Sequence, residues 1–140
     1  MDFDKETQVR ILRVAADRQG DRSVEENDEH IAAVMDLHPE FDEIWQQGEL
    51  ATFPQEINGM VVNPFVHTVL HVIVDKQIRD GNPEIAAETF KKLTGQGMDE
   101  HETLHAIIAQ YADIHFGNFR QGKPFDHLDY HSRLQQLSYE

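Results

Sequence analysis

The chain has 140 residues, of which 12 are Lys or Arg and 26 are Asp or Glu, and its formal net charge is −14 at pH 7. This length and a hydrophobic fraction of 39% suffice for one hydrophobic core, so we predict a single domain over residues 1–140. The negative charge argues against nucleic acid and against an anionic membrane surface as partners. The absence of Cys excludes disulfides and thiolate chemistry, which leaves His, Asp and Glu as the strong metal ligands.

The N-terminal segment has neither the basic residues nor the apolar run of a signal peptide. No stretch approaches the roughly 18 apolar residues that a membrane span requires. We therefore expect a cytoplasmic protein without membrane partners. A homo-oligomer is compatible with its content of His and aromatic residues.

Apolar residues recur mostly at helical spacing, with Gly and Pro between the segments, which predicts an all-α fold. We expect a single-domain helical bundle of about five to six helices. The first helix is expected at residues 5–18, with Val9, Leu12 and Ala16 on its apolar face.

Residues 23–38 are expected to form a second helix, because Ser23 and Glu26 have the Ser-x-x-Glu spacing of a capping box. Pro39 should end this helix. A short helix is expected at residues 40–47, and residues 46–60 are interpreted mostly as a connection.

A long helix is expected at residues 64–80, because Asn63 is a good N-cap and Pro64 suits the first helical position. A strand is the alternative, since the segment is rich in Val, but its length and its Asn-Pro start favour a helix. This helix is apolar on nearly all sides, so it should lie in the core. Further helices are expected at residues 83–93, at residues 99–119 with Asp99 as the cap, and at residues 126–137. The aromatic residues expected in the core are Trp45, Phe65, Phe90 and Phe119.

Nine His residues include three pairs four positions apart, a spacing that places both imidazoles on one helix face. The pairs are His67 with His71, His101 with His105, and His127 with His131. The first two pairs occupy the first two turns of the helices at 64–80 and 99–119. If consecutive helices alternate in direction, these two helices are parallel and their pairs can meet.

Four neutral imidazoles, from His67, His71, His101 and His105, would suit a transition metal ion, with zinc or iron as our prediction. The positive ends of two helices oppose a bare cation, so a further ligand is expected. Candidates for that ligand are His38, Glu40, Asp75 and Asp113.

Residues 101–105 also read His-Glu-x-x-His, in which metallopeptidases use Glu as the general base. The third-ligand extension of one such group would need Gly at Ile108 and His at Tyr111, and both differ here. Glu102 also suits a capping role with Asp99. Glu102 and Glu40 therefore remain weak candidates for a catalytic base, and His115 is interpreted as a core or interface residue.

Two segments, His38-Pro39-Glu40-Phe41 and Asn63-Pro64-Phe65-Val66-His67, are followed by His71, Gln77, His101 and His105. In this order they resemble the bacterial domain-of-unknown-function family 1841, over about residues 25–138. The resemblance implies a small, soluble, bacterial helical protein whose characteristic polar set includes His38 and the first two His pairs. It adds no reaction. Asp42 stands where the family often has another His, and His115 lies outside the likeness.

The sequence therefore predicts a helical protein with a four-His metal site. One alternative is a metal-free helical interaction module in which the His residues are structural. A second alternative is a metal-dependent hydrolase that uses the His-Glu-x-x-His string.

Overall fold

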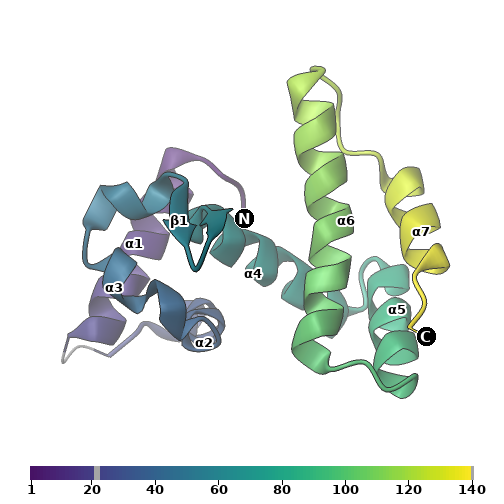
Figure 1. Ribbon diagram of the computed structural model, residues 1–140, viewed down its shortest axis with the longest axis horizontal. Coiled ribbons are helices and arrows are strands. Elements are labelled where there is room, and N and C mark those ends of the chain that lie inside the picture. Colours follow the sequence, from purple (N-terminus) through teal and green to yellow (C-terminus); the bar gives the residue numbers. More distant parts are fainter. Residues whose placement is uncertain (21–22, 140) are drawn as a thin grey trace. The chain divides into compact units, whose positions relative to one another are not determined.

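The computed structural model describes residues 1–20 and 23–139. The chain forms two compact units, one at Met1–Val72 and one that begins at Ile73, and each is described by itself (Figure 1). Seven α-helices and one two-stranded sheet lie in the described residues, which confirms the all-α fold class. In the same residues, no helix combines the length and the apolar character needed to cross a membrane.

The first unit consists of short helices, three 3₁₀ turns, a β-hairpin and the first part of a long helix. Its helices are α1 (Lys5–Gln19), α2 (Glu29–Asp36), α3 (Asp42–Trp45) and the start of α4 (Pro64–Asp80). Its 3₁₀ turns are η1 (Glu26–Asp28), η2 (Pro39–Phe41) and η3 (Gly48–Thr52). Its strands are β1 (Gln55–Ile57) and β2 (Met60–Val62).

Helix α1 has nearly the expected limits but buries a different face from the one predicted. Asp4 caps its start by accepting a hydrogen bond from the Thr7 amide at 2.8 Å. The buried side chains include Ile11, Val14 and Ala15, whereas Val9 is exposed. Several apolar stripes are possible on this helix, and the packing against α2 and α3 determines which one is buried.

The start of α2 corrects the expected capping box. The helix begins at Glu29 after η1, and the Ser23–Glu26 box is not formed. Asp28 is buried and accepts hydrogen bonds from Arg10 at 2.7 Å and from Arg13 at 2.9 Å. The start of α2 therefore follows from this long-range ion pairing and not from the local Ser-x-x-Glu pattern.

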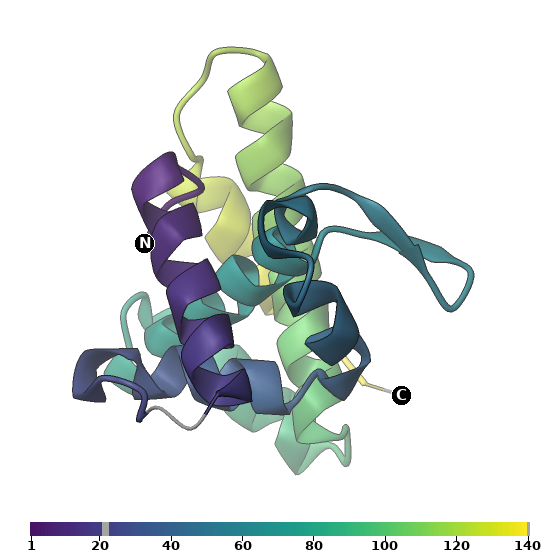
Figure 2. The ribbon, with the colours of Figure 1, turned by 90° about the vertical axis from the view of Figure 1, so that its left-hand side faces the viewer.

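Residues 46–60 contain more structure than the predicted connection. The turn η3 leads into the antiparallel strands β1 and β2, in which Ile57 pairs with Met60. Asn58 and Gly59 have φ angles of 52° and 83°, as the two central residues of a hairpin turn require. In the first unit this hairpin projects away from the helices (Figure 2).

Helix α4 has the predicted limits. Asn63 accepts a hydrogen bond from the Val66 amide at 3.1 Å and donates one to the Thr52 carbonyl at 2.9 Å, so it both caps α4 and fixes η3. Phe65 and Val69 are buried, as expected for a core helix. The helix continues through Val72 into the second unit.

The second unit contains the end of α4 and the three helices α5 (Glu84–Gly95), α6 (Glu100–Arg120) and α7 (His127–Gln136). Asp99 and Asp126 cap α6 and α7, as the sequence predicts for Asp99. Tyr130 on α7 donates a hydrogen bond from its hydroxyl to the side-chain Oε1 of Gln77 on α4 at 2.7 Å. Trp45 and Phe65 are buried as expected, but Phe119 is 75% exposed because it lies in the last turn of α6.

Candidate metal centre

His38 lies just after α2 and immediately before Pro39. A residue that precedes proline is disfavoured in the helical region, so the chain leaves the helix here and the ring can turn back over its last turn. The His38 Nδ1 lies 2.8 Å from the Val34 carbonyl oxygen, and the side chain is buried. A carbonyl only accepts, so Nδ1 carries the proton and the lone pair is on Nε2.

His67 and His71 lie in the first two turns of α4, and their ring centroids are 4.8 Å apart. His71 is buried and His67 is half-buried. The four-residue spacing predicted that these rings would share a face, and the centroid distance confirms it. The Asn63 cap fixes where α4 starts, so it also sets the height of both rings on the helix.

Three imidazoles of the first unit, those of His38, His67 and His71, converge on one point. The centroid of the His38 ring lies 4.6 Å from that of His67 and 4.5 Å from that of His71. Each residue offers a ring nitrogen within 4.8 Å of the nitrogens offered by the others. The three residues therefore have the proximity that ligands of one ion need.

The shortest nitrogen separation joins His38 Nε2 to His67 Nε2, at 3.1 Å. Two nitrogens bound at 2.0–2.1 Å to one tetrahedral zinc ion lie about 3.3 Å apart, so this separation nearly matches a coordinated pair. Without a metal, the same distance allows His67 to donate a hydrogen bond to His38. The geometry thus suits both an ion and a direct imidazole contact.

Phe41 forms one wall of this cluster. Its ring stacks on His38 with a centroid distance of 5.5 Å and an interplanar angle of 9°, and it meets the edge of His67 at 5.5 Å. The side chain is buried. An apolar wall restricts access of water and limits rotation of His38, which favours a preorganised site.

The second predicted pair also forms as expected on α6. The centroids of His101 and His105 are 4.3 Å apart, and Asp99 caps this helix through the amides of His101 and Glu102. The Glu102 side chain is exposed, as is that of Glu40 on η2.

The two candidate Asp ligands are engaged in ion pairs. Asp75 pairs with Arg79 on the same helix at 3.1 Å, and Asp113 pairs with Arg133 at 2.6 Å. An Asp ligand would have to give up or share its Arg. His115 stacks on Tyr111, with centroids 6.0 Å apart.

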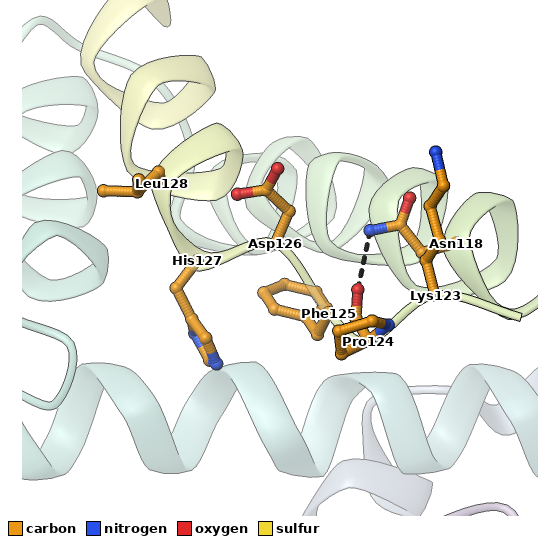
Figure 3. A pocket seen from close by; sticks show the side chains of 7 residues that line it. All are labelled: Asn118, Lys123, Pro124, Phe125, Asp126, His127 and Leu128. Carbon is orange, nitrogen blue, oxygen red and sulfur yellow. Dashed lines mark hydrogen bonds between the residues drawn. The ribbon is translucent and has the colours of Figure 1, made fainter.

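The third His pair lies on α7, and His127 lines a pocket of about 420 Å³ in the second unit (Figure 3). Both His127 and His131 are exposed. The His127 ring packs against Phe125 with a centroid distance of 5.0 Å, and Asn118 closes the loop by donating to the Pro124 carbonyl at 3.0 Å. This pair therefore serves as an exposed reference for the buried His38 and His71.

His38 is one of the three converging rings, whereas the sequence predicts it only as an additional ligand. A signal was present in the sequence. His38 continues the stripe of Ile31, Val34 and Met35 at helical spacing, and these three residues are buried. The position of His38 on this stripe, directly before Pro39, is the signal that could have indicated a side chain facing the core.

Comparison with known proteins gives one result at the level of the family. No curated protein and no solved structure matches the chain. A family model matches residues 5–136, so the shared region includes α1 and begins before the residue 25 that the His and Pro motifs indicated. That model describes a domain of unknown function (DUF1841), and the chain belongs to this family.

Proposed function

We propose that this protein binds one transition metal ion, zinc or iron, through His38, His67 and His71 of the first unit. For the remaining ligand we propose a residue of the pair His101 and His105, as the four-residue spacing in the sequence predicts. Four imidazoles satisfy a tetrahedral ion without a carboxylate.

The observation that carries the proposal is the hydrogen bond from His38 Nδ1 to the Val34 carbonyl. A His ligand in a metal site usually donates its second N–H to a carbonyl or a carboxylate, which orients the ring and raises its basicity. Here that bond directs the Nε2 lone pair of His38 to within 3.1 Å of His67 Nε2. This bond and the convergence of three imidazoles on one point together support the ligand role.

The ligand set supports zinc or iron over magnesium or calcium. Imidazole nitrogen suits zinc, copper, nickel and iron, whereas magnesium and calcium prefer oxygen ligands. Within the first unit the three converging side chains all offer nitrogen. The hydrolase alternative has less support, because Glu40 and Glu102 are both exposed.

Elemental analysis of the full-length protein, purified without a His-tag or added metal, tests the proposal. We expect about one zinc or iron per chain, and we expect His38→Ala to lose most of it. His131→Ala is the matched control, because it removes an exposed His and should leave the metal content unchanged. Wild-type protein without metal, even after incubation with zinc and iron(II), would instead support the metal-free interaction module.

A second comparison tests the fourth ligand. The variants His101→Ala and His105→Ala are compared, and loss of the residue that completes the site should lower metal affinity. If the two variants retain the wild-type affinity while His38→Ala does not, the site consists of three His residues and this pair supplies no ligand. The proposal of a metal site in the first unit would stand in that case.

A further inference from the structure

The β-hairpin of the first unit exposes an apolar residue beside an acidic one. Glu56 of β1 and Val61 of β2 pair across the ladder, so their side chains share a face. Both are exposed, and Val61 is exposed to 76%. The residues on the other face, Gln55, Ile57 and Val62, are only partly exposed, apart from Met60 next to the turn.

The backbone of this pair is also oriented outward. In a two-residue hairpin the pair next to the turn, here Ile57 and Met60, is the hydrogen-bonded one. The next pair, Glu56 and Val61, is then non-hydrogen-bonded, so its N–H and C=O groups point away from the partner strand. Each strand thus offers donors and acceptors at its outer edge.

Further apolar side chains are exposed in the segment that leads to the hairpin. Leu50 and Phe53 are each exposed to 59%, and Met60 is exposed to 69%. Single exposed apolar residues are ordinary, but this short segment has four of them with Val61 included. Proteins commonly protect a sheet edge with Lys, and neither strand contains one.

The charged residues of the chain segment that contains the hairpin have one sign. Residues 23–72 contain no Lys or Arg, against ten Asp or Glu. In the hairpin segment the charged residues are Glu49 and Glu56, both exposed. A second copy of this chain, with its own net charge of −14, would be repelled, as would an anionic membrane or a nucleic acid.

We propose that the hairpin face at Glu56 and Val61 docks a basic, extended polypeptide segment that carries both Lys or Arg and apolar residues at alternate positions. Alternate side chains of an extended segment point to one side, so a cation and an apolar residue two positions apart lie on the same face. The cation can then face Glu56 while the apolar residue contacts Val61, and the main chain bonds to the outward groups of the strand edge. This surface is separate from the His cluster.

The probe is a fluorescently labelled synthetic Lys-Val peptide of repeat Lys-Ser-Val-Ser, in which Lys and Val share one face of the extended chain, titrated with the full-length protein. In the comparison peptides Gly replaces Val (the Lys-Gly peptide) or Glu replaces Lys. Fluorescence anisotropy should show binding of the Lys-Val peptide alone, with amide NMR shifts concentrated at residues 50–62. Val61→Thr and Glu56→Lys should each weaken binding about tenfold.

The matched controls are Glu88→Lys, which makes the same charge change on α5, and Val9→Ala, which removes another exposed apolar side chain. Neither should weaken binding more than about twofold. Equal binding of the Lys-Gly peptide, equal loss from Glu88→Lys and Glu56→Lys, or no binding at all would overturn the proposal. Self-association that broadens the hairpin amides without peptide would also overturn it, in favour of a second copy.

Discussion

The Nε2 atoms of His38 and His67 lie 3.1 Å apart, although 29 residues separate them in the chain. Two local features make this contact possible. Helix α2 ends at Asp36, and His38 has a non-helical conformation directly before Pro39. Asn63 fixes the start of α4 at a height that presents His67. The candidate centre is thus placed by a helix end and a helix start.

The first prediction concerns coupling between these two residues. His38→Ala should already lose most of the metal, as should His67→Ala, and the double variant should lose little more. Ligands of one ion act as a unit, so their effects on metal affinity are not additive. Metal affinities measured by competition with a chelator check this. Losses of binding free energy that add in full would indicate two independent sites.

The second prediction concerns Asp28 and acid. Burial would raise the pKa of Asp28, but the hydrogen bonds from Arg10 and Arg13 outweigh it and hold its pKa below the usual 3.8. The charged form therefore stabilises the fold above pH 3.8, and this contribution is lost as the pH falls through the folded-state pKa. Asp28→Asn should lower the free energy of unfolding at pH 7 by about 1–3 kcal/mol.

Urea unfolding between pH 7 and pH 3 measures this effect. The difference between wild type and Asp28→Asn should shrink toward the acid end. Asp36→Asn serves as the control, because Asp36 is exposed and its pair with Arg18 should contribute less than about 1 kcal/mol. A difference that stays constant over this range would show that the charge of Asp28 is not what stabilises the fold.

The third prediction concerns Tyr130 and alkali. Burial raises the pKa of Tyr130, with a smaller contribution from Tyr111. The stability that the neutral hydroxyl supplies is present below pH 10 and is lost as the pH rises further, because the unfolded chain ionises first. Tyr130→Phe should cost about 0.5–1.5 kcal/mol at pH 7, since it removes the hydrogen bond to Gln77. Above pH 10 the melting temperature should fall less steeply with pH for Tyr130→Phe than for the wild type. Parallel slopes would contradict this explanation.

The fourth prediction concerns the hairpin turn. Gly59 has a φ angle of 83°, so Gly59→Ala should destabilise the protein by about 1 kcal/mol. Gly117 lies inside α6 with open space at its Cβ position, so Gly117→Ala should stabilise it by about 0.5–1 kcal/mol. Melting temperatures measure both changes. A stabilising Gly59→Ala would mean that the turn does not have this conformation.

The sequence predicts the features that depend on neighbouring residues. The Asn63 cap, the limits of α4 and the Asp99 cap all follow from local hydrogen bonding. The hairpin also has a local signal, because Asn58-Gly59 between Ile57 and Met60 is a strong turn sequence. The interpretation of residues 46–60 as a connection misses this signal.

Other features depend on contacts far along the chain. Arg10 and Arg13 bind Asp28 and move the start of α2, and nothing near Ser23 signals this. The buried face of α1 likewise depends on its partner helices rather than on its own apolar pattern. For the candidate centre, spacing predicts each His pair, but the role of His38 needs the tertiary contact with α4.

X-ray absorption by the metal-loaded, full-length protein tests the central claim most directly. We predict a first shell of nitrogen at about 2.0–2.1 Å with the outer-shell pattern of imidazole, and the loss of one imidazole in His38→Ala. The control variant His131→Ala should give the wild-type spectrum. A first shell dominated by oxygen, or a His38→Ala spectrum identical to that of the wild type, would contradict the assignment of His38, His67 and His71 as ligands.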